Sequence, residues 1–169
     1  MATPVPLDAA HVDEMLRVIN DAATAYRGAI PADRYHEPYM PREELAAEMA
    51  EMRFWGSFAE GRLVGVMGVQ DVQDVTLVRH AYVETAYQGR GIGTALLRHV
   101  EALAGRPVVL IGTWAAATWA VRFYERQGYA LVADRAEKDA LLRRYWHVPD
   151  RQIETSVVLR KVLPRAGQG

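Results

Sequence analysis

The sequence contains no cysteine, and this absence removes several kinds of chemistry at once. Without thiols the chain can form no disulfide, no thiolate metal site and no cysteine nucleophile. A chain without disulfides also suits a reducing compartment, so we expect a cytoplasmic protein.

Long apolar runs and an excess of charge of one sign are missing as well. No segment approaches the roughly 18 apolar residues of a membrane-spanning helix, and the N-terminal residues lack the pattern of a signal peptide. The 20 basic and 21 acidic side chains give a net charge of −1. No overall field therefore attracts nucleic acid or an anionic membrane, so we expect neither as a partner and any anion site must be local.

Metal-ligand patterns are also lacking. The five histidines never pair with one another at helical spacing and form no H-E-x-x-H pattern. We therefore expect no metal site.

The chain is long enough for one domain with a sizeable core, because half of its 169 residues are apolar. We predict a single domain over residues 1–163 and a flexible tail over 164–169. Helical periodicity predicts helices after Asp8 and Pro41 and over 94–103, 116–127 and 137–146. Strand patterns cover 54–59, 63–69, 75–83, 108–111, 129–133 and 153–159. This order predicts a mixed α/β fold whose first strands are antiparallel.

A glycine-rich loop lies between the predicted strand 75–83 and the following helix. It reads Gln88-Gly89-Arg90-Gly91-Ile92-Gly93-Thr94. Glycines let the backbone approach a ligand closely, and the unpaired amides of a helix N-terminus attract anions. Arg90 and the Thr94 hydroxyl can add donors. The loop is therefore a candidate phosphate cradle.

Two common phosphate-binding loops do not match this segment. A dinucleotide-binding loop requires a third glycine where Thr94 stands, and a P-loop requires a lysine that the segment lacks.

The segment does resemble the signature of the GNAT superfamily of N-acetyltransferases, Gln/Arg-x-x-Gly-x-Gly/Ala. Gln88, Gly91 and Gly93 fill its fixed positions, and Phe123-Tyr124 and Gly128-Tyr129 follow at the family's spacing. The resemblance covers residues 75–133 well. It implies a GNAT-like α/β fold in which a mixed central sheet splays in the middle, and acetyl-CoA as the co-substrate.

The resemblance also implies how the cofactor binds. The backbone of Tyr82 and Val83 should bond the pantetheine arm, and residues 88–94 should surround the pyrophosphate. Two departures stand out. Many relatives carry an asparagine where this chain has Ala117, and Leu77 and Arg79 occupy positions where some relatives carry the catalytic base.

Tyr124 matches the family tyrosine near the cofactor sulfur, so we expect it to stabilise the departing thiolate. Glu84 is the carboxylate nearest the loop and is our candidate base. His80, Asp71 and Asp74 are further choices, and water acting on an already neutral amine is an alternative.

For the acceptor, the resemblance assigns walls that here hold many aromatic residues. Tyr26, Arg27, Tyr39 and Trp114 are the candidate contacts, and this compact lining suits a small ligand. The predicted activity is acetyl transfer from acetyl-CoA to a primary amine of a small molecule, by direct attack on the thioester. Alternatives are acylation of a protein N-terminus or lysine, and a non-catalytic acyl-CoA sensor. A homodimer is compatible with the sequence, which does not predict one.

Overall fold

The computed structural model describes residues 3–164, and the chain divides into two compact units. The first unit contains the residues up to Gln70 together with Val78–Leu103, and the second contains Asp71–Leu77 and the residues from Ala104 onward. The division crosses the two strands Arg62–Val72 and Val75–Val83, so each unit contains a part of both. Of the predicted tail, residues 165–169 lie outside the described residues.

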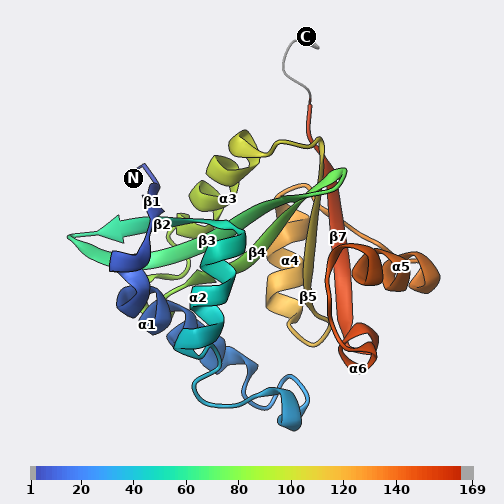
Figure 1. Cartoon of the computed structure of the whole chain (residues 1–169), viewed down its shortest axis with the longest axis horizontal. Coiled ribbons are helices and arrows are strands. Elements are labelled where there is room, and N and C mark those ends of the chain that lie inside the picture. The colour runs from blue at the N-terminus through green and yellow to red at the C-terminus, as the bar shows by residue number, and fades with distance from the viewer. Residues whose placement is uncertain (1–2, 165–169) are drawn as a thin grey trace. The chain divides into compact units, whose positions relative to one another are not determined.

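The first unit is built on antiparallel strands in the order β1-β2-β3-β4 (Figure 1). Their bounds are β1 Val5–Leu7, β2 Arg53–Ala59, β3 Arg62–Val72 and β4 Val75–Val83, the last two shared with the second unit. β2 is antiparallel to both β1 and β3. The predicted strands 54–59, 63–69 and 75–83 are confirmed, whereas β1 was missed because three residues are too few for a period to appear.

Helices contribute to both faces of these strands. α1 (Val12–Ala22) and α2 (Arg42–Glu51) share an apolar cluster with Phe54 and Val66 of the strands. The next residue along β2, Trp55, packs instead against His99 of the helix α3 (Ile92–Leu103), with ring centroids 4.4 Å apart. This alternation follows from the two-residue period of a strand.

The approach of α3 (Ile92–Leu103) to the sheet depends on a glycine in β3. A Cβ at Gly65 would lie 2.9 Å from both Ile92 Cγ2 and Leu96 Cδ1, closer than packed carbon atoms tolerate. The glycine thus lets the first turn of α3 rest directly on β3.

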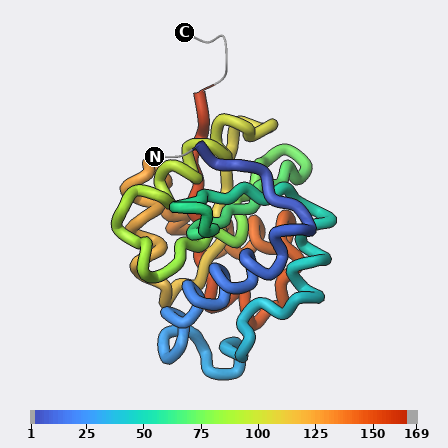
Figure 2. Tube along the Cα trace, turned by 90° about the vertical axis from the view of Figure 1, so that its left-hand side faces the viewer, coloured from blue at the N-terminus to red at the C-terminus, as the bar shows by residue number. Residues whose placement is uncertain are grey.

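α1 and α2 are neighbours, and the chain between them makes a long excursion. A 3₁₀ turn (Ala23–Tyr26) extends α1, and a second one (Ala32–Arg34) lies further along the excursion. Figures 1 and 2 both show residues 27–40 looping beyond the ends of the two helices. Contacts within the segment, such as those of Tyr39 with Tyr26 and Tyr35, help to shape it.

The second unit continues from its part of β4 in the order β4-β5-β7-β6. β5 (Val108–Trp114) pairs antiparallel with β7 (Ser156–Val162) along its whole length, and β6 (Ala130–Leu131) pairs with the outer side of β7. The helices are α4 Thr118–Arg126, α5 Arg135–Tyr145 and α6 Asp150–Glu154.

This unit has its own apolar core. Leu110 and Val158 of the paired strands pack with Leu142 and Trp146 at the end of α5, and with Ile153 of α6. Because these strands and helices bury apolar side chains in one core, their apolar residues recur in the sequence with the periods that predicted them.

The predicted last strand, 153–159, is partly wrong. Asp150–Glu154 forms the short helix α6, and the strand begins only at Ser156. Pro149 precedes the first helical residue and Asp150 lies in the first turn, both of which favour a helix start. Ile153 is buried from this helix, so its apolar character does not mark a strand.

The predicted α/β class is confirmed: a seven-stranded mixed sheet is flanked by helices. Within residues 3–164, no helix is both long enough and apolar enough to cross a membrane.

Candidate active site

The glycine loop leads from the end of β4 directly into α3. Gly89 and Gly91 have φ angles of 78° and 82°, in the left-handed region that favours glycine. A Cβ at Gly89 would meet no atom within 4 Å, and residues 88–91 are exposed. The loop therefore presents open backbone to an approaching ligand.

α3 starts two residues earlier than the sequence predicted, which places more of the loop in its first turn. Its first intrahelical bond runs from the Ala95 amide to the Gly91 carbonyl, at 3.0 Å. The Ile92 and Gly93 amides precede that bond, so they have no acceptor one turn back in the helix. The positive end of the helix dipole lies at the same place. This geometry fits a pyrophosphate.

Side chains of the loop bond its own backbone. The Gln88 side-chain amide donates to the Val83 carbonyl at 3.0 Å, closing the loop onto the end of β4. Arg90 donates to the Ala86 carbonyl at 3.3 Å, and its guanidinium lies 4.9 Å from the centre of the Tyr87 ring. Arg90 was predicted as a phosphate donor, and this bond occupies only one of its five N–H groups.

The turn before the loop is anchored to α1. An Asp21 carboxylate oxygen accepts a hydrogen bond from the Thr85 amide at 2.7 Å, and the Glu84 amide donates to Val64 of β3 at 2.8 Å. These two bonds attach residues 84–85 to both a helix and a strand.

Glu84 itself is a buried carboxylate between two arginines. Its side chain lies 3.1 Å from an Arg17 nitrogen and accepts two hydrogen bonds from Arg62, at 2.5 and 3.1 Å. The bonds from Arg62, with a further contribution from Arg17, hold the pKa of Glu84 below its ordinary value. A general base must accept a proton near the working pH, so this geometry favours a structural role over the predicted catalytic one.

His80, another candidate base, also contacts neighbouring side chains. Its Nε2 lies 3.4 Å from a Glu48 carboxylate oxygen, which is 3.3 Å from Arg79 as well, and its ring stacks on Phe54. The close approach of the His80 ring, with a further contribution from Arg79, lowers the pKa of Glu48. His80 has a φ of 53° inside β4, a conformation typical of a β-bulge.

The two aspartates among the candidate bases have partners in the second unit. Asp71 accepts from the Thr76 hydroxyl at 2.6 Å and from the Gly105 amide at 3.1 Å. Asp74 accepts from the Tyr145 hydroxyl at 2.5 Å, which lowers the pKa of Asp74. Neither carboxylate is arranged as a general base.

Three tyrosines gather in the first unit. The Tyr26 ring lies 5.2 Å from the ring of Tyr39 and 6.4 Å from that of Tyr82 on β4. Burial raises the pKa of Tyr26 to about 12, so its phenol stays protonated at neutral pH. Tyr26 and Tyr39, two of the predicted acceptor contacts, thus lie beside Tyr82, whose backbone was predicted to bond the pantetheine arm.

Arg27, the third predicted acceptor contact in this unit, is paired within its own segment. It forms an ion pair with Glu37 and lies over the Tyr35 ring at 5.6 Å. The Arg27 and Glu37 charges therefore compensate each other.

The remaining predicted site residues belong to the second unit. Tyr124 is buried on α4, with its ring 5.3 Å from Phe123 and 6.1 Å from Tyr129. Trp114 is buried at the end of β5, opposite Ser156.

Residues 20–143 match the family model described as an acetyltransferase (GNAT) domain. This chain belongs to the GNAT acetyltransferase family. It is an acetyl-CoA-dependent N-acetyltransferase, as the loop predicted. A comparison with curated protein sequences gave no match.

Solved structures share the fold of this GNAT enzyme at low sequence identity. PaiA N-acetyltransferase from Thermoplasma acidophilum, in complex with coenzyme A, has a TM-score of 0.72 at 16% identity, covering 96% of this chain and 99% of its own. The ribosomal-protein-S18-alanine N-acetyltransferase from Escherichia coli has a TM-score of 0.69 at 18% identity, and the match covers 100% of this chain and 98% of that protein. Rv2747 from Mycobacterium tuberculosis, in complex with CoA and NLQ, has a TM-score of 0.66 at 18% identity, and the match covers 96% of this chain and 100% of that protein.

Among residues 3–164 of the acetyltransferase, no group of three or more histidine, aspartate or glutamate side chains could hold a metal ion. The anchoring residues Asp21, Arg17 and Arg62 were missed at the sequence level. They lie far along the chain from the loop, and no local pattern distinguishes them from ordinary surface charges.

Replacing Glu84 by glutamine should weaken the fold without removing a base. We expect the free energy of unfolding at pH 7 to fall by about 1–3 kcal/mol, because two charge-assisted hydrogen bonds are lost. The native pKa is lowered, so the stabilisation is present above the unfolded value of about 4.3 and is lost as the pH falls through the native pKa. Urea unfolding of both proteins between pH 3 and 7 measures this.

The exposed Glu51→Gln variant is the control and should match the native enzyme. The activity profile of Glu84→Gln should keep its shape against pH. Loss of the acidic limb of kcat/KM would instead identify Glu84 as the base.

Proposed function

We propose that the enzyme transfers an acetyl group from acetyl-CoA to a primary amine of a small-molecule acceptor. The observation that carries this proposal is the exposed loop at the start of α3, with Gly89 and Gly91 in the left-handed region and helix-terminal amides behind them. Such a loop suits a diphosphate.

In this proposal residues 88–94 surround the pyrophosphate, and the backbone of Tyr82 and Val83 bonds the pantetheine arm. The complexes of the Thermoplasma and Mycobacterium proteins with coenzyme A support cofactor binding by this fold. Gln88 would keep the loop in shape through its bond to Val83.

The chemistry requires a neutral amine. Its nitrogen attacks the thioester carbonyl, a C–N bond forms, the C–S bond breaks, and the thiolate leaves while the amine proton passes to water. The carboxylates Glu84, Asp71 and Asp74 are already bonded to other groups, so we assign proton removal to water. The Tyr124 hydroxyl would donate a hydrogen bond to the departing sulfur.

A small acceptor is favoured by the tyrosine cluster and by the Arg27–Glu37 ion pair. Aromatic walls with compensated charge suit a compact amine better than an extended peptide. The ribosomal-protein acetyltransferase from Escherichia coli supports the alternative acceptor, a protein N-terminus. Cytoplasmic location remains a prediction.

Thiol release from acetyl-CoA, measured against a panel of small amines and peptides, tests the proposal. Turnover should be highest with small primary amines. Preference for peptides would favour the alternative of a protein-modifying enzyme. Binding of acetyl-CoA without thiol release in the presence of any acceptor would favour a non-catalytic sensor.

Gly89→Ala should weaken coenzyme A binding by about 10-fold or more, because a Cβ would occupy the space that the diphosphate approaches. Gly61 in the β2–β3 turn provides a matched control: it also has a φ of 78° and nothing within 4 Å of an added Cβ. Both variants should lose similar stability, about 1 kcal/mol, from the shared backbone conformation. Calorimetric titration with coenzyme A measures the difference, and equal affinities in the two variants would contradict the cradle.

Tyr124→Phe should lower turnover about 100-fold while the KM for acetyl-CoA stays within about 3-fold, because the hydroxyl acts only as charge develops on sulfur. Tyr129→Phe changes a neighbouring buried tyrosine and should retain native turnover. Steady-state kinetics of both variants decides the role. Native turnover in Tyr124→Phe would exclude it.

A further inference from the structure

A polar stripe on α1 contacts the backbone at the start of β3 and just after the end of β4. It consists of Glu14, Arg17 and Asp21, whose spacing of three and four residues places them on one face of the helix. A Glu14 carboxylate oxygen accepts from the Leu63 amide at 3.4 Å, and Arg17 donates to the Leu63 carbonyl at 2.8 Å. Asp21 accepts from the Thr85 amide at 2.7 Å. The stripe thus ends at the turn that leads into the glycine loop.

This turn is a short 3₁₀ helix, Thr85–Tyr87, that lacks a cap from its own neighbour. The first amides of a helical turn have no acceptor within it, and the side chain of the preceding residue often accepts from one of them. The preceding residue is Glu84, whose side chain is held by two arginines and makes no such bond. Asp21 supplies the missing acceptor from another helix.

Hydrogen bonds continue from the capped turn into the loop. The Gln88 amide donates to the Thr85 carbonyl at 3.3 Å, and the Tyr87 amide donates to the Glu84 carbonyl at 2.8 Å. The Thr85 peptide group is therefore bonded to Asp21 through its amide or its neighbour's chain on one side and to Gln88 through its carbonyl on the other. Gln88 is the first residue of the proposed diphosphate cradle.

The place of Asp21 in its own helix does not explain the residue. Asp21 lies in the last turn of α1 (Val12–Ala22), where the helix dipole disfavours a negative charge. Its backbone carbonyl accepts from the Thr24 hydroxyl at 2.7 Å, which helps to fix the end of the helix. The stabilising contact of the carboxylate is therefore the bond to Thr85, outside α1.

We propose that Asp21 is a positioning residue for coenzyme A. By capping the turn before the glycine loop, it holds the loop in the conformation that receives the diphosphate. It acts through Thr85 and Gln88 and does not touch the ligand. This inference rests on the proposed function, in which residues 88–94 surround the pyrophosphate. Without the cap the loop must be ordered on binding, and the affinity falls by the cost of that ordering.

Calorimetric titration of the full chain with coenzyme A tests the proposal in two variants of the same residue. Asp21→Ala should bind about 10-fold more weakly, because the Thr85 amide loses its acceptor. Asp21→Asn should bind within about 2-fold of the native chain, because the side-chain amide oxygen still accepts a hydrogen bond. This rescue would identify the hydrogen bond, and not the negative charge, as the property that matters.

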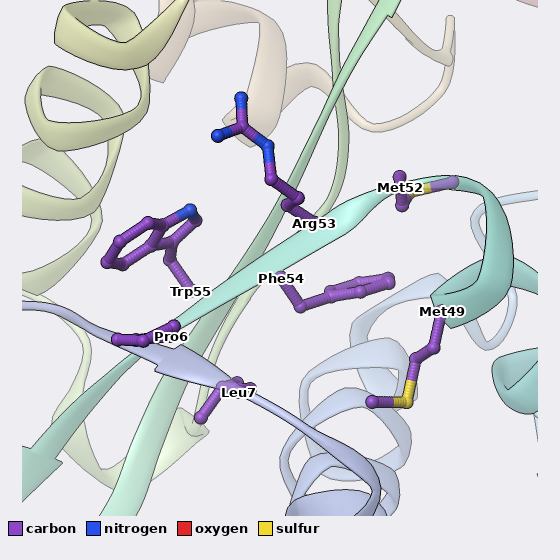
Figure 3. Close-up of a pocket in the computed structure, with 7 residues that line it drawn as sticks. All are labelled: Pro6, Leu7, Met49, Met52, Arg53, Phe54 and Trp55. Carbon is purple, nitrogen blue, oxygen red and sulfur yellow. The ribbon is translucent and has the colours of Figure 1, made fainter.

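Two control variants separate positioning from a loss of stability. Asp8 caps another 3₁₀ turn of the same unit by accepting from the Ala10 amide at 2.9 Å, so Asp8→Ala removes a cap of the same kind. Met49→Ala truncates a side chain that lines a cavity of about 230 Å³, where β1 runs beside the start of β2 and the end of α2 (Figure 3). Both variants should unfold at a lower temperature and still bind coenzyme A with native affinity.

A comparison of two acetyl donors gives a readout that a merely structural role would not change. S-acetylpantetheine lacks the diphosphate of acetyl-CoA. With the amine that the native enzyme acetylates fastest, Asp21→Ala should lower kcat/KM for acetyl-CoA about 10-fold, through KM, and change kcat/KM for S-acetylpantetheine less than about 2-fold.

Native affinity for coenzyme A in Asp21→Ala, or equal losses in Asp21→Ala and Asp21→Asn, would overturn the proposal. Equal losses of kcat/KM with the two donors would also overturn it. Absence of thiol release with every acceptor would contradict the proposed acetyl transfer alone, because the calorimetric comparison of the variants still decides the role of Asp21. Absence of coenzyme A binding by the native chain would contradict both.

Discussion

The loop that leads into the unpaired amides at the start of α3 is the feature of the first unit on which the proposed function depends. Several neighbouring residues hold this loop in place. Gly65 lets the helix rest on β3, and the Gln88 side chain closes the loop onto the end of β4. Asp21 and Glu84 attach the preceding turn to α1, β3 and two arginines. In the proposed function, a loop preorganised in this way would bind a diphosphate without first having to become ordered.

The charges around the cradle are compensated within the protein. Glu84 lies between Arg17 and Arg62, Glu48 contacts Arg79 and His80, and Arg27 pairs with Glu37. Glu84 and Glu48 are thus paired with cations and poorly placed to take a proton, and Arg27 is poorly placed to hold a charged acceptor. This explains why the proposed chemistry relies on a neutral amine, on the position of the thioester and on a tyrosine hydroxyl instead of a carboxylate base.

The sequence predicted the loop, the strand before it and the apolar faces of both units, because these features are local and periodic. It predicted less well wherever the deciding contact lies far along the chain. Glu84 was a reasonable candidate base because it precedes the loop closely in the sequence. Its partners lie far along the chain, since Arg62 is 22 residues away and Arg17 belongs to α1. Ile153 suggested a strand because a single buried apolar residue does not reveal its period. The cavity beside β1 could not be predicted, since β1 itself has only three residues.

Amide chemical shifts measured during a titration address the central interaction most directly. Coenzyme A contains the diphosphate and pantetheine lacks it, so the two ligands separate the cradle from the rest of the cofactor site. The account predicts that coenzyme A shifts the amide signals of Gly89, Gly91, Ile92 and Gly93 strongly, and that pantetheine at equal concentration leaves them nearly unchanged. Binding of coenzyme A with those four signals unmoved would contradict it.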